Sequence, residues 1–140
     1  MIKFYKEDHD FPQIVLEDVL AKTNIKVENR GTLESACNFY DPCCLNLASH
    51  IRPGGGYESV MDVRMPIKTQ EEDLFRRSDL PKLMDTEEVR QFYPLDGLKG
   101  VYCSKILVTK TAKLEPCIPF EISLISLAAV VNPQSNQWSS

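Results

Sequence analysis

Three consecutive glycines behind a short apolar run constrain this chain more than any other feature of its sequence. Gly54, Gly55 and Gly56 follow the run Cys43–Ala48, which predicts a buried strand that ends in a loop. Glycines permit positive φ and leave backbone N–H groups open to a ligand such as a diphosphate. In open α/β sheets, ligands bind where loops leave the carboxyl ends of strands. The glycines occupy such a place, although a plain turn would also explain a glycine triplet.

Two adjacent carboxylates come next along the chain. Thirteen residues separate the glycines from Gln70, Glu71 and Glu72. Thr69 can cap a helix that runs from Gln70 to about Arg77. Paired carboxylates suit acid–base chemistry on a bond held nearby. In the first turn of a helix they are also stabilised by the helix dipole, so the residues alone leave a purely structural role open.

The remaining pattern predicts many short elements in a single α/β domain over residues 1–140, with a polar tail at 134–140. Thr32 and Thr86 are expected to cap helices. The strand at residues 43–48 is expected to lie at the centre of the sheet. We expect helices over residues 11–21, 32–39, 70–77, 79–83 and 86–93, and strands over residues 24–27, 43–48 and within 100–110. The apolar stretch at residues 118–131 could be a strand or a helix by its periodicity.

Charge and hydropathy exclude several classes of protein. The net charge is −4 with both signs interspersed, which gives no electrostatic case for binding a nucleic-acid duplex. No apolar run reaches the roughly 18 residues of a membrane-spanning helix, so no membrane contact is expected. The first residues are charged and lack the apolar core of a signal peptide, which favours a cytoplasmic location.

The cysteines and histidines do not predict a metal site. Cysteines are odd in number and none shows C-x-x-C spacing, while His9 and His50 lie far apart. We expect no zinc site, and cysteines that are small buried apolar residues in a reducing compartment. The five are Cys37, Cys43, Cys44, Cys103 and Cys117.

Taken together, these motifs resemble the microbial-type poly(ADP-ribose) glycohydrolase macrodomains. LNLASHIRPGGG, ending at Gly56, resembles the family's LNFASAKNPGGG, and QEEDLFRRSDL, starting at Gln70, resembles QEE-x-L-x-RRS-x-L. IKVENRGTLESA at residues 25–36 is similar to the family's entry segment. The segments YPL, GVYCSKILVTK and ISLISLAAVVNP follow the family's order, so the resemblance covers residues 25–133.

The chain departs from the family pattern in three places. Arg52 stands where the family has Asn, and the connection at residues 57–69 is longer than usual. The family also continues into a second glycine-rich phosphate loop, whereas all six glycines here lie before residue 101. We therefore expect a macrodomain-like fold that is incomplete at its C-terminus.

The resemblance implies a three-layer α/β/α fold with a mixed sheet and ADP-ribose in a cleft above the strand ends. It also favours a strand at residues 120–131 and implies that neither a metal nor a redox cofactor is needed. It implies that Glu72 is the catalytic acid and then the base, and that Glu71 orients the ribose hydroxyls. N–H groups of the glycines would hold the diphosphate, and Asn46 would reach the adenine side. Tyr57 would either stack on the ligand or close the loop. The implied ligand-binding residues are Asn46, Gly54, Gly55, Gly56, Tyr57 and Gln70.

The implied function is an ADP-ribosyl hydrolase that cleaves the ribose–ribose O-glycosidic bond of poly(ADP-ribose). Two alternatives remain open at this point. One is a weak or inactive macrodomain that binds ADP-ribose or a related nucleotide, and the other is a fragment that acts through protein contacts. If the sheet ends early, residues 120–131 become an unpaired apolar edge, so we expect a homodimer or a partner chain to cover it.

Overall fold

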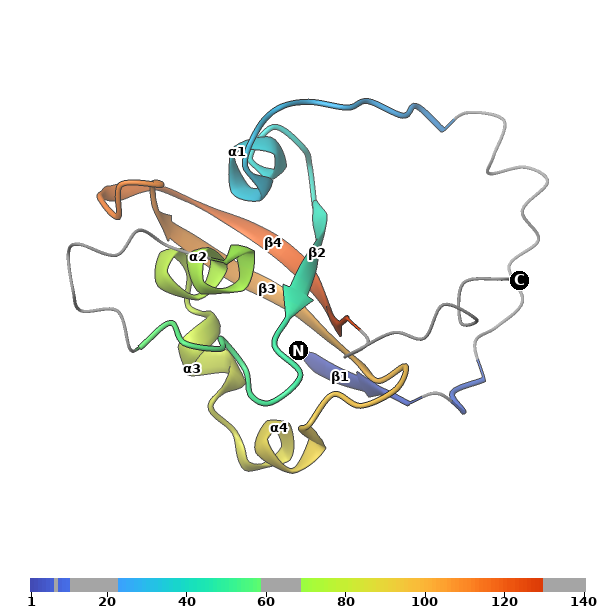
Figure 1. The fold of residues 1–140 in the computed structure, drawn as a ribbon. Coiled ribbons are helices and arrows are strands. Elements are labelled where there is room, and N and C mark those ends of the chain that lie inside the picture. Colours follow the sequence, from blue (N-terminus) through green and yellow to red (C-terminus); the bar gives the residue numbers. More distant parts are fainter. Residues whose placement is uncertain (7, 11–22, 59–68, 130–140) are drawn as a thin grey trace.

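The computed structural model describes residues 1–6, 8–10, 23–58 and 69–129 (Figure 1). The predicted helix at 11–21 and the polar tail at 134–140 lie outside these residues. Eight elements follow one another in the order β1 (Ile2–Tyr5), α1 (Thr32–Ala36), β2 (Cys43–Ala48), α2 (Gln70–Arg77), α3 (Leu80–Met84), α4 (Glu87–Phe92), β3 (Gly100–Lys110) and β4 (Pro116–Ala128).

The four described strands form one mixed sheet in the order β1-β3-β4-β2. Strand β3 is antiparallel to both β1 and β4, whereas β2 runs parallel to β4. Antiparallel neighbours connected by a short turn and a parallel pair joined through helices are the expected mixture for an α/β fold. The predicted α/β class with a mixed sheet is therefore confirmed.

Two predictions about the sheet are wrong for the described residues. Strand β2 is an edge strand and not the central one, because β4 is its neighbour on one side and the described residues place no strand on the other. Strand β4 lies between β3 and β2, so residues 120–128 are not an unpaired edge. The sequence pattern showed apolar strands but not their order. The expected homodimer or partner chain stays a prediction without that argument behind it.

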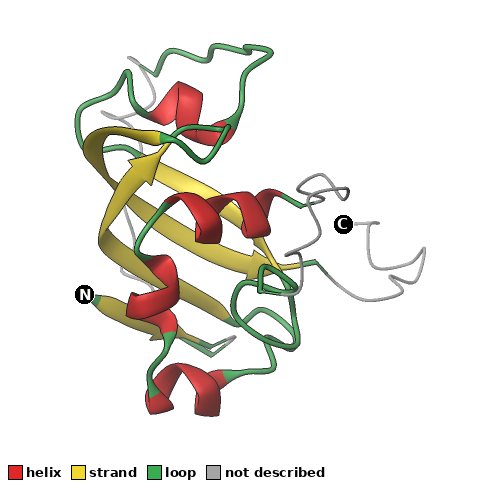
Figure 2. Cartoon of the chain, turned by 90° about the vertical axis from the view of Figure 1, so that its left-hand side faces the viewer, coloured by secondary structure: helices red, strands yellow, loops and turns green. Residues whose placement is uncertain are grey.

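A single apolar cluster joins the helices to one face of the sheet. Strand β2 alternates between exposed and buried residues, and Cys44 and Ala48 point into the cluster with residues of β3, β4 and all four helices. Figure 2 shows α2 and α3 in front of the sheet. The opposite face carries side chains that are exposed in the described residues, namely Leu45, Leu47, Ile125 and Leu127. The described residues thus supply two layers of the expected three.

The helix that carries the paired carboxylates begins where the sequence predicts. The Thr69 side chain accepts a hydrogen bond of 3.2 Å from the Glu72 N–H, and the Thr86 side chain accepts one of 3.3 Å from the Val89 N–H. Each cap satisfies an N–H that has no partner inside its helix. Both predicted caps are confirmed.

Other local predictions fail. Thr32 does not cap α1, because Gly31 occupies the N-cap position without a side-chain bond and the Thr32 hydroxyl accepts from Gln70 Nε2 at 2.9 Å instead. The helix also ends at Ala36 and not at residue 39. Residues 24–27 form no strand, and Ile25 and Val27 are exposed. Although apolar and polar residues alternate in this segment, no strand among the described residues lies beside it to pair with.

Candidate active site

The glycine loop, residues 52–58, leaves the carboxyl end of β2 and folds over α2. Gly54 has φ 77° and Gly55 has φ 55°, a region that other residues rarely adopt. A Cβ on Gly54 would lie 2.5 Å from Tyr57 Cδ1 and 2.6 Å from Phe75 Cδ1. Only glycine therefore fits at position 54, and the loop is held tightly against α2.

Two of the three glycine N–H groups already have partners. The Gly55 N–H donates to the Arg52 carbonyl at 3.3 Å, and the Gly54 N–H bonds to the Glu71 carboxylate. The Tyr57 N–H, next in the chain, donates to the Gly54 carbonyl at 3.0 Å. A diphosphate bound by all three glycine N–H groups would have to displace these bonds, so that role stays a prediction.

Glu71 lies beneath the loop with only 2% of its surface exposed. Its Oε2 atom accepts from the Ser49 N–H at 2.8 Å, and its Oε1 atom accepts from Asn46 Nδ2 at 3.3 Å. Burial raises the pKa of Glu71, the bonds from Ser49, Gly54 and Asn46 oppose that shift, and the nearby charge of Glu72 adds to it. Glu71 thus joins the end of β2, the loop and α2 at one carboxylate.

Glu72 faces the middle of the loop. A Cβ on Gly56 would lie 3.4 Å from Glu72 Oε1, so a glycine leaves the approach to this carboxylate open. Its Oε2 atom lies 3.6 Å from Arg76 Nη2. That oxygen is buried and has no hydrogen-bond partner within the described part of the chain. A carboxylate with a free buried oxygen beside an open backbone is suitably placed to exchange a proton with a ligand.

The two arginines that follow the carboxylates serve different parts of the fold. Arg76 donates from Nε and Nη2 to the Tyr57 carbonyl at 3.2 and 3.1 Å. Arg77 contacts α1 and β3 as well as its own helix, with Glu34 at 2.5 Å, Asp73 at 2.9 Å and the Lys110 carbonyl at 3.1 Å. Arg77 therefore connects elements of the fold, whereas Arg76 contacts the glycine loop.

The side chains of Asn46 and Gln70 make hydrogen bonds to other groups of the protein. The Asn46 side chain is 1% exposed and donates to Ser126 Oγ at 3.0 Å as well as to Glu71. The Gln70 side chain accepts from the Leu47 N–H and donates to the Leu45 carbonyl, both at 2.9 Å, and so occupies the outer edge of β2. Direct contact of either side chain with a ligand stays a prediction.

Tyr57 packs inward. Its ring lies 5.1 Å from the ring of Phe75, centroid to centroid, and its hydroxyl donates to Glu58 Oε1 at 3.1 Å. Burial raises the pKa of Tyr57, and the bond to Glu58 raises it further. The ring thus packs on α2, while Tyr57 also lines the neighbouring cleft, so both of its expected roles stay predictions.

Sequence reasoning missed two members of the site besides Arg76. One is Ser49, whose backbone N–H binds Glu71 and which no motif distinguishes. The other is Tyr93, whose hydroxyl is buried and has no hydrogen-bond partner among the residues described. Burial raises the pKa of Tyr93, and the charge of Glu71 contributes to the rise. Its membership in the YPL segment was the only available signal.

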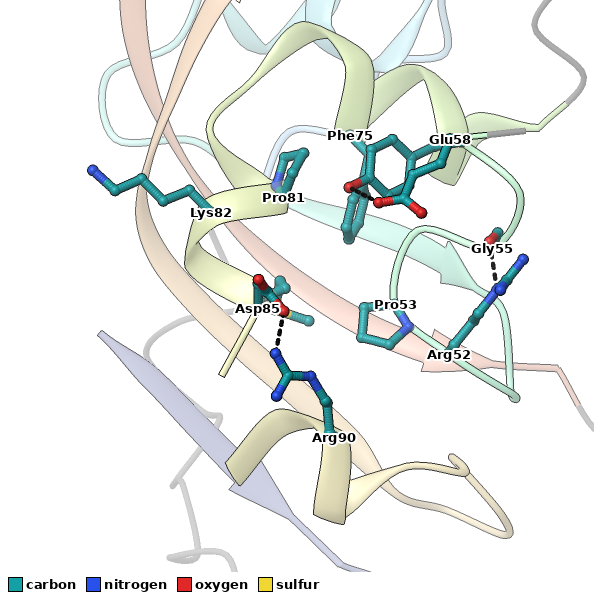
Figure 3. A pocket seen from close by; sticks show the side chains of 11 residues that line it. Arg52, Pro53, Gly55, Glu58, Phe75, Pro81, Lys82, Asp85 and Arg90 are labelled. Atoms are coloured by element: carbon teal, nitrogen blue, oxygen red, sulfur yellow. Dashed lines mark hydrogen bonds and ion pairs between the residues drawn. The ribbon is translucent and has the colours of Figure 1, made fainter. Parts of the chain in front are cut away.

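A cleft of about 550 Å³ lies between the glycine loop and the α3–α4 region (Figure 3). This volume is in the range of small-molecule sites. Arg52 donates from Nε to the Gly55 carbonyl at 2.8 Å on one side of the cleft, and Arg90 pairs with Asp85 on the other. Neither Glu71 nor Glu72 lines it. The lining residues are Arg52, Pro53, Gly55, Tyr57, Glu58, Phe75, Pro81, Lys82, Met84, Asp85 and Arg90.

The described residues hold no group of three or more His, Cys, Asp or Glu side chains that could bind a metal ion. All five cysteines are free thiols. Within the same residues, no helix is long and apolar enough to cross a membrane.

Solved structures of two bacterial enzymes share this fold. Poly(ADP-ribose) glycohydrolase from Thermomonospora curvata, bound to the inhibitor ADP-HPD, is 24% identical with a TM-score of 0.69, and the match covers 91% of this chain and 48% of that one. The enzyme from Deinococcus radiodurans, in complex with ADP-ribose, is 20% identical with a TM-score of 0.59 and covers 71% and 42%. This chain thus spans less than half the length of either enzyme.

Among curated protein sequences, none matches this chain. The sequence model of the microbial-type PARG catalytic domain matches residues 3–110 of the 140, a range that includes the glycine loop and α2. With the glycine loop lying over two carboxylates and the fold shared with both enzymes, the chain belongs to the family of microbial-type poly(ADP-ribose) glycohydrolase (PARG) catalytic domains.

Proposed function

We propose that this chain binds ADP-ribose at the glycine loop and takes part in hydrolysis of the ribose–ribose O-glycosidic bond of poly(ADP-ribose). The observation that carries the proposal is the position of Glu72, whose Oε1 atom would lie 3.4 Å from a Cβ at Gly56. A ligand that follows the loop backbone therefore passes this carboxylate. Membership in the family and the ligands of the two bacterial enzymes support the same chemistry.

In the proposed reaction, Glu72 acts first as an acid and then as a base. Its carboxyl proton passes to the 2′-oxygen of the leaving ribose as the bond from that oxygen to the anomeric carbon breaks. The anomeric carbon becomes oxocarbenium-like, and nearby negative charge stabilises it. Water then adds to this carbon and gives its proton to the Glu72 carboxylate, so the enzyme returns to its starting state with one water consumed.

Glu71 supports this step from below the loop. Its two oxygens already bind Ser49 and Asn46, and Gly54 bonds to the same carboxylate. Through these hydrogen bonds Glu71 fixes the position of the glycine loop relative to α2. We propose that any contact between Glu71 and the ribose hydroxyls adds to this holding role, since a carboxylate oxygen can accept more than one hydrogen bond.

Binding without turnover is the second candidate. It is favoured by the internal bonds of the Gly54 and Gly55 N–H groups, because these bonds compete with a bound diphosphate. In this candidate Glu72 would contact the ligand and leave its glycosidic bond intact.

Glu72→Gln separates the two candidates, because the amide keeps the shape of the side chain and cannot transfer the proton. Isothermal titration with ADP-ribose and chromatographic detection of ADP-ribose released from poly(ADP-ribose) are measured on the same preparations. A hydrolase predicts turnover reduced about 100-fold or more and affinity changed only a few-fold. Glu88→Gln on the exposed side of α4 is the control.

The outcomes of this experiment are distinct. Turnover by Glu72→Gln equal to that of the parent would remove Glu72 from the mechanism. A parent chain that binds ADP-ribose but releases none from the polymer would establish the second candidate. A parent chain that does not bind ADP-ribose would reject both.

We propose a reducing location, the cytoplasm, for this activity. The support is that all five cysteines are free, including exposed Cys37 and Cys43. Exposed thiols survive best where disulfide formation is disfavoured. We further propose that the binding partners are ADP-ribose and poly(ADP-ribose) and that a nucleic-acid duplex is not bound, which the net charge of −4 supports.

A further inference from the structure

We propose that Arg76 is a positioning residue that fixes the far end of the glycine loop and aligns Glu72 beneath it; this inference rests on the proposed function. The guanidinium donates to the Tyr57 carbonyl from both Nε and Nη2, at 3.2 and 3.1 Å. Two donors on one oxygen fix both the distance and the direction of that peptide group. Tyr57, the residue directly after Gly56, is thereby tied to the last turn of α2.

The same guanidinium also contacts the carboxylate. Arg76 Nη2 lies 3.6 Å from Glu72 Oε2, and the two side chains are only 11% and 13% exposed. A charge pair in such a sheltered place is screened weakly by salt and water. The Arg76 side chain therefore links the loop backbone to the carboxylate that we propose as the acid.

The loop is held from α2 at both of its ends. Glu71 bonds to the Gly54 N–H at the first end, and Arg76 bonds to the Tyr57 carbonyl at the second. Gly55 and Gly56 lie between these two anchors. The short stretch that remains for a ligand is then the stretch that faces Glu72, because a Cβ on Gly56 would lie 3.4 Å from its Oε1 atom.

Two buried polar atoms beside this link make no hydrogen bond within the described residues, namely Arg76 Nη1 and Glu72 Oε2. The Glu72 oxygen has the ion pair with Arg76 Nη2 at 3.6 Å, which is too long for a hydrogen bond. Buried polar atoms usually make hydrogen bonds, so a donor and an acceptor without them on neighbouring side chains indicate a place where a bound molecule supplies the missing bonds. A purely structural arginine would not leave these atoms open, as Arg77 shows with its contacts to Glu34, Asp73 and the Lys110 carbonyl.

Arg77 is the matched control, since it is the next residue of the same helix and, within the described residues, bonds to Glu34, Asp73 and the Lys110 carbonyl rather than to the loop. Three variants are compared with the parent chain: Arg76→Gln, Arg76→Lys and Arg77→Gln. Lysine keeps a positive charge near Glu72 and loses the two-pronged bond to Tyr57. The first measurement is amide hydrogen exchange of Gly55 and Tyr57 in the ligand-free protein, relative to amides within α2.

We expect Arg76→Gln to accelerate exchange at Gly55 and Tyr57 at least about tenfold relative to α2, and to weaken ADP-ribose binding by a similar factor. Arg76→Lys is expected to retain the accelerated exchange while recovering part of the affinity. Arg77→Gln is expected to lower the urea midpoint without selective change at the loop amides. This pattern separates a loop anchor from a residue that only stabilises the fold.

Unchanged loop exchange in Arg76→Gln would overturn the inference, whatever the affinity. Equal acceleration in Arg77→Gln would overturn it as well, because the effect would then follow global stability. Selective acceleration in Arg76→Gln supports the inference even if the parent chain fails to bind ADP-ribose, and in that case it is the proposed function that fails. The exchange measurement thus tests Arg76 independently of the ligand.

Discussion

The backbone N–H of Ser49 donates a hydrogen bond of 2.8 Å to the Oε2 atom of Glu71. This bond joins the segment that leaves β2 to the first turn of α2. It also explains why a carboxylate is tolerated with only 2% of its surface exposed, since buried polar groups require hydrogen-bond partners. The candidate active site is therefore built on the same contact that closes this part of the fold.

Replacement of Glu71 by alanine should destabilise the protein. The N–H of Ser49 would lose its acceptor, and the Asn46 amide would lose its bond to Glu71 while keeping the one to Ser126 Oγ. One unsatisfied buried group costs about 1–3 kcal/mol, so we expect a loss of about that size in urea unfolding at neutral pH. Glu88→Ala, on an exposed surface, should change the free energy of unfolding by less than about 0.5 kcal/mol. Equal effects of the two changes would contradict this role of Glu71.

The stability contributed by Glu71 should depend on pH. Burial raises the pKa of Glu71 above its ordinary value of 4.5, so the folded state holds this proton more tightly than the unfolded state. The corresponding stability is fully present below 4.5 and is lost as pH rises through the raised pKa. The free energy of unfolding of the parent minus that of Glu71→Gln should fall over this window. A difference that stays constant from about pH 4 to 8 would show that Glu71 does not titrate in this way.

The three glycines should not tolerate alanine equally. Gly54→Ala combines positive φ with a Cβ 2.5 Å from the Tyr57 ring, so overpacking of about 1–3 kcal/mol adds to a backbone cost of about 1–2 kcal/mol. Gly55→Ala carries only the backbone cost, because its Cβ would meet nothing closer than 3.5 Å. Gly56→Ala should fold almost normally and yet weaken ADP-ribose binding, since its methyl group faces Glu72. Urea unfolding and calorimetry check the order, and an equal loss of stability at all three positions would contradict it.

Gln70→Glu should destabilise the junction of β2 and α2. The Gln70 Nε2 atom donates to the Leu45 carbonyl and to Thr32 Oγ1, both at 2.9 Å, and a carboxylate would place an oxygen against that carbonyl. We expect a loss of about 1–3 kcal/mol in the free energy of unfolding. Gln91→Glu is a suitable control, because its amide bonds only to Glu87 on an exposed helix surface. A similar response at positions 70 and 91 would contradict a role for Gln70 at the strand edge.

Local features of the fold could be predicted from the sequence because nearby residues determine them. The strand Cys43–Ala48, the strand Gly100–Lys110 and the helix capped by Thr69 all follow from short patterns. The order of the strands could not be predicted, because it depends on which strands pair across distant parts of the chain. The prediction of a central β2 failed for that reason, since an apolar strand is compatible with an edge position once helices cover one face.

Some features of the candidate site could likewise be predicted from the sequence, and others could not. The resemblance placed Gly56 and Glu72 in one site, and the structure brings them together. It did not indicate that Asn46 and Gln70 would make hydrogen bonds within the protein, because partners 25 and 23 residues away leave no local signal. Arg76 and Arg77 appear in the sequence only as the arginine pair of the QEEDLFRRSDL motif. Their separate roles depend on a helical offset that sends one side chain to the loop and the next to α1 and β3.

Strand β2 is apolar on both faces, since exposed Leu45 and Leu47 alternate with buried Cys44 and Ala48. In most sheets, a shift of one residue would turn the polar face of a strand toward the core. In β2 both faces are apolar, so hydrophobicity alone does not oppose such a shift. Asn46 removes this ambiguity, because it pairs directly with Ser126 of β4 and donates to its hydroxyl at 3.0 Å. A shift of β2 by one residue would bury a leucine against Glu71 and expose the Asn46 amide to solvent. The polar contact that supports the acidic site therefore also specifies the alignment of the sheet.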